Sequence, residues 1–243
     1  SYFMARNPHR FVMSCSYNSQ LATDFGRQVR SVVEQKQMLQ AFPEFTLSTE
    51  SRAADVWRTE VGGAYFAVGV GGTTSGRPAN LLLVDDPIKS REDAESMTQR
   101  NKTWNYYTSA LATRLQPESG GSPPKQIVIL TRWHPDDLAG RLQQSEDWQE
   151  GRWTHVNFPA ITKTKGEPIR RTRLPKDHPM YLNNDELNKL AKTKRHIHEE
   201  AEAPLWPERF PIEDLKRRER LNPREFASLY QQQPYIEGGN IIK

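Results

Sequence analysis

Two adjacent carboxylates, Asp85 and Asp86, directly follow the apolar run Leu81–Val84. Neighbouring carboxylates repel each other unless a cation or a proton lies between them. Mg²⁺ is commonly held by one or two carboxylates together with the phosphates of a substrate. The pair therefore predicts magnesium-dependent phosphate chemistry at this point of the chain.

A second apolar run, QIVIL at 126–130, ends in Thr131, Arg132 and His134. Short apolar runs with abrupt polar ends are typical of buried strands in a parallel sheet. The carboxyl ends of such strands form the ligand crevice. We therefore expect Thr131 to lie close to the two aspartates. For His134, a helix-capping or packing role is favoured over catalysis.

Strand-like and helix-like segments alternate over the first two-thirds of the chain, which favours an α/β fold with a parallel sheet and right-handed crossovers. Predicted strands cover residues 11–17, 64–70, 81–86, 126–130 and 153–161. Predicted helices cover 19–37, 90–115 and the segment with Leu138 and Leu142, with Pro135 in its first turn. A glycine-rich loop at 71–79 carries Arg77.

The chain changes character after Ile161. Residues 163–195 hold ten Lys or Arg against four Asp or Glu. Such a cluster is either an electrostatic footprint for nucleic acid or a solvated loop and helix face. Candidate DNA contacts here are Arg170, Arg171 and Arg173, to phosphates rather than bases. Helices are predicted at 184–200, 211–221 and 223–233.

Composition limits the class of protein. The chain has 243 residues, 35% of them hydrophobic, and one cysteine, so an intrachain disulfide is excluded. No apolar run is long enough for a transmembrane helix, and the first residues do not resemble a signal peptide. A reducing, intracellular setting without a membrane partner is expected. Cys15, inside a predicted strand, is expected to be a buried and inert thiol.

Four segments taken together resemble the large terminase subunit of tailed bacteriophages, the DNA-packaging motor. They are NPHRFVMSCSYNSQLATDFGRQVR, GVGGTTSGRPANLLLVDDPIKSREDAES, QIVILTRWHPDDLAGRL and LWPERFPIEDLKRR…LNPREFASLYQQQP. Their order and spacing are those of the ATPase domain of the family. The resemblance covers nearly the whole chain and implies a P-loop NTPase-like (ASCE) core that uses ATP and Mg²⁺, with a small, mainly helical C-terminal subdomain.

The resemblance also implies roles for single residues. Asp85 corresponds to the acid that positions Mg²⁺, and Thr131 to a coupling residue that senses the γ-phosphate, with Arg132 beside it at the nucleotide. Asp86 falls where many relatives carry a catalytic glutamate; its shorter side chain leaves Glu92 and Glu95 as alternative bases. Arg77 is a candidate arginine finger for a neighbouring subunit. The other interpretation of Arg77 is a salt bridge or a contact with DNA phosphates.

No G-x-x-x-x-G-K-[ST] motif occurs in the sequence. In the family this phosphate loop precedes the segment that resembles SYFMARNPHRF, and a nuclease domain follows near IEGGNIIK. We therefore expect residues 1–161 to be an ATPase core, 162–234 a basic linker and helical subdomain, and 235–243 the start of a linker to the nuclease. Alone, such a chain should hydrolyse ATP negligibly.

The function implied is ATP-driven translocation of double-stranded DNA into procapsids. The expected partners are the terminase small subunit, the portal protein and other copies of the chain in a ring. The expected location is the cytoplasm of an infected or lysogenic bacterial host. Two alternatives stay open: another helicase-like ATPase core, and a degenerate, prophage-derived remnant that binds DNA or a partner without turnover.

Overall fold

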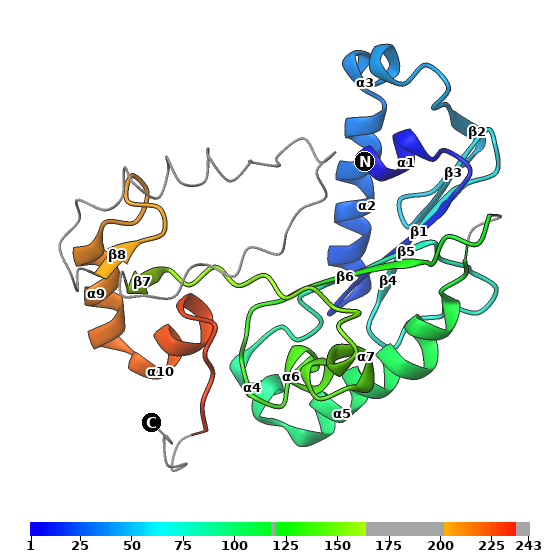
Figure 1. The fold of residues 1–243 in the computed structure, drawn as a ribbon. Helices are drawn as coiled ribbons and strands as arrows, with labels where there is room; N and C mark the ends of the chain where they lie inside the picture. Colours follow the sequence, from blue (N-terminus) through cyan, green and yellow to red (C-terminus); the bar gives the residue numbers. More distant parts are fainter. Residues whose placement is uncertain (118–119, 164–201, 237–243) are drawn as a thin grey trace. The chain divides into compact units, whose positions relative to one another are not determined.

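The structure is a computed structural model that describes residues 1–117, 120–163 and 202–236 (Figure 1). The chain divides into two compact units, 1–142 and 143–243. We describe each unit by itself. These two units are defined by how compactly their residues pack, not by function. The functional boundary predicted at residue 161 therefore stays a prediction. The predicted helix 184–200 and the arginines at 170, 171 and 173 lie outside the described residues.

A six-stranded sheet in the order β2-β3-β4-β1-β5-β6 forms the centre of the first unit (Figure 1). The strands are β1 (Phe11–Ser16), β2 (Leu47–Arg52), β3 (Val56–Thr59), β4 (Ala64–Gly69), β5 (Leu81–Asp85) and β6 (Lys125–Ile129). β4, β1, β5 and β6 are parallel to one another, whereas β2 and β3 add on in antiparallel orientation. The fold is therefore α/β with a mostly parallel sheet, as predicted.

Burial explains which strands were predictable. All residues of β4, and all of β1 except Phe11, are buried, as expected for strands covered on both faces. The four predicted strands that form the parallel sheet are confirmed to within two residues at each end. The antiparallel pair β2–β3 was not predicted, because its sequences, LSTESR and VWRT, contain no continuous apolar run.

Helix α2 (Ser19–Val33) packs on one face of the sheet through Ala22 and Val33, against Val12 and Tyr65. It begins at Asn18, whose side chain accepts a hydrogen bond from the Leu21 amide at 2.8 Å. The prediction of a helix to residue 37 is wrong. Val33 is the last buried residue of α2, and the polar residues that follow have no apolar side to bury. The chain starts again as α3 (Lys36–Ala41).

The single helix predicted over 90–115 is also wrong in detail. The segment forms α4 (Arg91–Glu95), α5 (Met97–Tyr106), a π-helical turn η1 (Tyr107–Leu111) and a 3₁₀ turn η2 (Ala112–Arg114). Ser96 breaks it, because its backbone is extended and its side chain accepts from the Gln99 amide to cap α5. The π turn buries both Tyr107 and Leu111.

Helix α6 (Leu138–Gln143) begins three residues after Pro135, so the prediction that Pro135 lies in its first turn is wrong. Only glycine fits at position 140 of this helix. A Cβ atom at this position would lie 1.8 Å from the Pro135 carbonyl oxygen, so the preceding turn packs directly on the helix backbone.

The second unit contains α7 (Glu146–Gln149), α9 (Ile212–Leu221), α10 (Pro223–Glu225), a π turn η3 (Phe226–Tyr230) and the antiparallel pair β7 (Ile161–Lys163) and β8 (Glu202–Pro204). Ile161, Leu215 and Phe226 form its core. The helix predicted at 223–233 ends at Tyr230.

The strand predicted over 153–161 is not formed, and β7 starts only at Ile161. Pro159 lacks an amide proton for a strand ladder. Instead, the Gln231 side chain holds the start of β7, accepting from the Ile161 amide at 2.9 Å and donating to its carbonyl at 3.0 Å.

Among the described residues, no helix combines the length and the apolar character needed to cross a bilayer.

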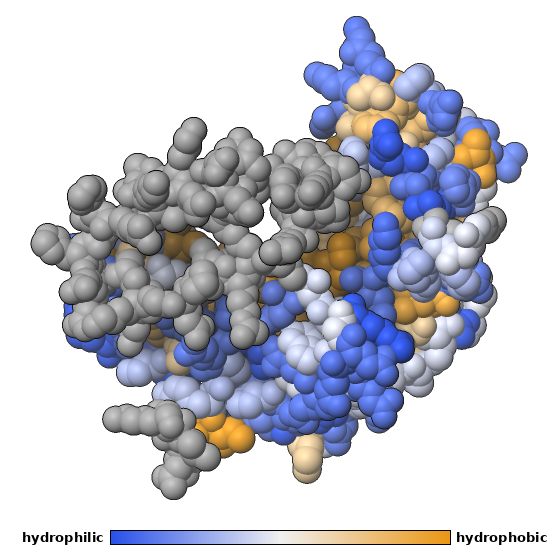
Figure 2. All heavy atoms as spheres, in the orientation of Figure 1, coloured by the Kyte–Doolittle hydropathy of each residue, from blue (hydrophilic) through white to orange (hydrophobic). Residues whose placement is uncertain are grey.

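Cys15 is fully buried in β1, and burial raises the pKa of its thiol to about 12, as expected for an inert thiol. Figure 2 shows mainly hydrophilic residues over α5 and α6.

Candidate functional site

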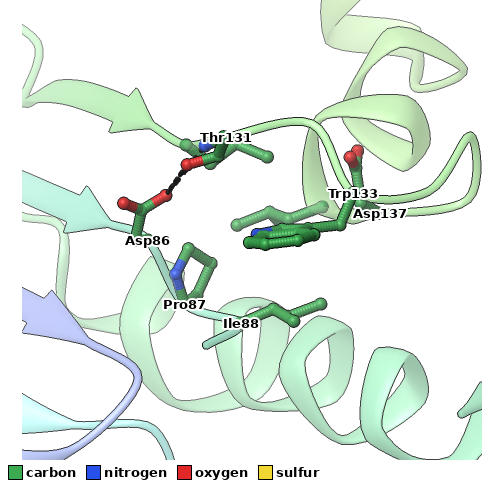
Figure 3. Close-up of a pocket in the computed structure, with 8 residues that line it drawn as sticks. Asp86, Pro87, Ile88, Thr131, Trp133 and Asp137 are labelled. Carbon is green, nitrogen blue, oxygen red and sulfur yellow. Dashed lines mark hydrogen bonds between the residues drawn. The ribbon is translucent and has the colours of Figure 1, made fainter. Parts of the chain in front are cut away.

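The ends of β5 and β6 lie side by side, because Asp85 is in register with Ile129. One step further along, Asp86 bridges the two strands. Its Oδ1 accepts hydrogen bonds from the Thr131 amide at 2.8 Å and from the Thr131 hydroxyl at 3.0 Å (Figure 3). The Asp86 amide donates to the Ile129 carbonyl at 2.9 Å. The juxtaposition expected between Asp86 and Thr131 is thus present.

The two aspartates have different surroundings. Asp86 has a φ of 41°, in the left-handed region, and this turn directs its carboxylate toward β6. Asp85 continues the strand and is half-buried. Burial raises the pKa of Asp85, and the charge of Asp86 raises it further. Within the described part of the chain, no hydrogen bond reaches the Asp85 carboxylate.

Ser16 lies next to Asp85, because β1 and β5 are in register up to Cys15 and Val84. Ser16 is 0% exposed, and its hydroxyl has no hydrogen-bond partner among the described residues. A buried hydroxyl without a partner is unusual and indicates an unfilled polar position. The end of β5 therefore has the character of a site that can accept a cation or water.

The loop after Thr131 is fixed by a buried ion pair. Arg132 donates through Nε to Asp137 Oδ2 at 2.8 Å, and Asp137 is only 2% exposed. The other Asp137 oxygen accepts from the Gly140 amide at 2.9 Å and so caps α6. Burial raises the pKa of Asp137, and the Arg132 cation opposes this rise. Arg132, predicted to contact a nucleotide, is held by Asp137 in this structure.

A second, more exposed ion pair lies beside the first. Asp136 accepts two hydrogen bonds from Arg141, at 2.7 and 2.8 Å, and one from Arg100 at 2.9 Å. The hydrogen bonds from Arg141 lower the pKa of Asp136 to about 2. His134 is 6% exposed, and its Nδ1 accepts from the Asp136 amide. Burial lowers the pKa of His134, and the Arg100 cation adds to this.

A narrow, mainly apolar hollow adjoins Asp86 and Thr131 (Figure 3). Pro87, Ile88 and Trp133 form its walls. The Arg91 guanidinium lies 5.4 Å from the centroid of the Trp133 ring. Trp133 was not predicted from the sequence. The signal available was a large aromatic residue between two polar ones directly after a strand end.

Arg77, Glu92 and Glu95 do not converge on this point. The Arg77 guanidinium lies 5.6 Å from the Phe66 ring centroid, and no hydrogen bond or ion pair among the described residues joins it to the aspartates. Glu92 is exposed on α4, and Glu95 is 3.7 Å from Arg91. The arginines at 170, 171 and 173 cannot be placed, since they lie outside the described residues.

Among the described residues, no three His, Cys, Asp or Glu side chains are arranged to hold a metal ion. A magnesium ion at Asp85 would therefore need water and phosphate oxygens as its further ligands, which is common for this ion. No protein-family model and no curated protein matches this chain.

Proposed function

We propose that this chain is the ATPase region of a motor that translocates double-stranded DNA, of the kind found in the large terminase subunit of tailed bacteriophages. The observation that carries the proposal is the placement of Asp85, Asp86 and Thr131 at one point of the carboxyl edge of a parallel sheet. Ligand sites of open α/β sheets lie at this edge.

In this proposal Asp85 holds Mg²⁺ together with water and the phosphates of ATP. The ion supplies charge neutralisation at the phosphates. A half-buried carboxylate with a raised pKa suits this role, since a cation would relieve the unfavourable burial of its charge. The partnerless Ser16 hydroxyl offers a further oxygen beside it.

Asp86 and Thr131 are proposed to act as a unit. Asp86 Oδ1 is occupied by Thr131, whereas Oδ2 makes no hydrogen bond to another described residue. A water molecule held by Oδ2 would be the attacking group. The Asp86 carboxylate would join it to the Thr131 hydroxyl, which is bound to Oδ1. A change at the γ-phosphate could then reach the loop 131–137 and α6. Glu92 and Glu95 remain alternative bases.

The edge of β6 that no described strand covers offers a place for a phosphate-binding segment. Among the described residues, β6 pairs with β5 alone. Ile127 and Ile129 are 45% and 58% exposed, and hydrophobic surface is seen where β6 crosses the view in Figure 2. A further strand added here would cover both isoleucines and bring its own end beside Thr131.

The partners proposed with this function are double-stranded DNA, a small terminase subunit, a portal protein and further copies of the chain in a ring, inside a bacterial host cell. The Arg77 guanidinium lies over the aromatic ring of Phe66, so it would have to leave this contact to serve as an arginine finger. Contact with an adjacent subunit would cause this movement. DNA contacts would be mostly to phosphates and sensitive to salt.

A second candidate function is binding of DNA or a partner without turnover. The absence of a G-x-x-x-x-G-K-[ST] motif from these 243 residues favours it. The two candidates differ in whether the chain, when joined to a segment that carries such a motif (the extended chain), shows magnesium-dependent ATP hydrolysis.

The test compares the extended chain with its Asp85→Asn variant. We expect ATP turnover in the extended chain and its loss in the variant. Asp85→Asn should not lower the thermal midpoint, because it removes a charge whose burial is unfavourable. Glu44→Gln, at an exposed position, is the matched control. Full turnover in Asp85→Asn would refute the role of Asp85. Absence of turnover from the extended chain would favour binding alone.

A further inference from the structure

The carboxyl edge of the sheet has a second hollow, on the side of β5 away from Thr131. It is an open crevice, and residues that follow β1, β4 and β5 contribute to its wall. Side chains that line it include Tyr17, Asn18, Lys89, Asp93, Gln99 and Lys102. None of them belongs to the Asp86–Thr131 bridge.

The crevice carries positive charge that is not neutralised within the described structure. Lys102 has no ion pair with another described residue. Lys89 lies 3.9 Å from Asp93, at the outer limit of an ion pair, and its side chain is 58% exposed. Two lysines and one aspartate therefore line the crevice, which leaves a net positive charge.

The uncharged groups of the crevice add hydrogen-bond donors. The oxygen of the Asn18 amide is already used to cap α2, so its NH₂ group is the part left for a ligand. Thr103, also in the lining, is 6% exposed, and its hydroxyl makes no hydrogen bond to another described residue. The Gln99 side chain is exposed at the same rim. Positive charge combined with such donors favours an anion with several acceptor oxygens.

We propose that this crevice binds a phosphate group. The phosphate belongs either to a DNA backbone or to a free phosphate or nucleotide. The DNA source rests on the proposed function, whereas the phosphate chemistry does not. The crevice lies on the side of β5 away from Thr131, because β1 and β4 are on the opposite side of β5 from β6.

The test uses the full chain and a Lys89→Gln/Lys102→Gln variant, which keeps the length of both side chains nearly unchanged. The matched control is Lys36→Gln/Lys125→Gln, which removes the same charge at two exposed positions outside the crevice. Two probes are titrated without ATP turnover: inorganic phosphate, followed by calorimetry, and a short DNA duplex, followed by fluorescence anisotropy at several salt concentrations.

If the ligand is DNA, the crevice variant should bind the duplex about tenfold or more weakly, with the salt slope reduced by about 0.9 for each phosphate that the variant no longer neutralises. If the ligand is a free phosphate, its binding should vanish in the crevice variant while DNA affinity stays unchanged. Either result, with the control variant unaffected, supports the site. Equal binding of both probes to all three proteins, or binding of neither probe, overturns it. Because no hydrolysis is measured, these outcomes do not depend on the ATPase proposal.

Discussion

Two of the segments that leave the sheet at its carboxyl edge, those after β1 and β6, are held by different forces. After β1 the chain enters α2, which is fixed by apolar burial of Ala22 and Val33. After β6 the chain runs through loop 131–137, which is fixed by the ion pairs of Asp136 and Asp137. Apolar packing is tolerant of direction, whereas hydrogen-bonded ion pairs impose geometry. The segment that positions Thr131 is thus the one with directional contacts.

The largest effect is expected from Asp137→Ala. This change leaves Arg132, 13% exposed, without its partner and removes the cap from the Gly140 amide. Breaking a buried ion pair in this way should lower the free energy of unfolding by about 3–5 kcal/mol. Urea denaturation measures it. The control is Asp24→Ala on the surface of α2, expected at about 0–1 kcal/mol. Equal losses would show that the Arg132–Asp137 pair does not fix the loop.

Val33→Ala examines the apolar half of the comparison. Val33 is 0% exposed, so removal of two methylene equivalents should lower the free energy of unfolding by about 2 kcal/mol. The loss should be the same at low and high salt, because no charge is involved. Val32→Ala is the matched control, since this neighbouring valine is 37% exposed and its truncation should cost little stability. A similar loss from both would mean that α2 does not depend on burial.

Thr131→Val examines the bridge between the two strand ends. The change keeps the side-chain volume and the amide hydrogen bond but removes the hydroxyl bond to Asp86. We expect a loss of about 1 kcal/mol in the free energy of unfolding. Combined with Asp86→Ala, which removes the acceptor, the two losses should be non-additive, because the residues share one contact. Strict additivity in the double-mutant cycle would contradict the bridge.

The smallest effect is the acid response of Asp136. Its pKa is about 2 in the folded protein, below its ordinary value of 3.8, so the carboxylate contributes stability above about pH 4. This contribution should disappear as the pH falls from about 4 to 2. The midpoint difference between the parent and Asp136→Asn should therefore shrink over this range. The Asp136 side chain is 42% exposed, so 1 M salt should also reduce the difference. A difference independent of pH would exclude the ionic contribution.

The sequence predicted the strands of the parallel sheet and the common edge at which they end. FVMSCS and LLLVD were recognisable as strands because burial on both faces requires continuous apolar runs. The meeting of Asp86 and Thr131 followed from the shared edge of parallel strands. The ion pair between Arg100 and Asp136 was not predictable, because the two residues are 36 apart in the sequence and only the fold joins them. The break at Ser96 was missed, since a local capping bond overrode helical periodicity.

The backbone of Asp86 also determines which acid fits at the strand end. Left-handed dihedral angles are adopted more readily by aspartate and asparagine than by residues with longer side chains. A glutamate at position 86 would be disfavoured by main-chain chirality, and its extra methylene would carry the carboxylate beyond the Thr131 amide. The left-handed backbone conformation of residue 86 therefore favours an aspartate, and the length of the aspartate side chain places its carboxylate at the Thr131 amide.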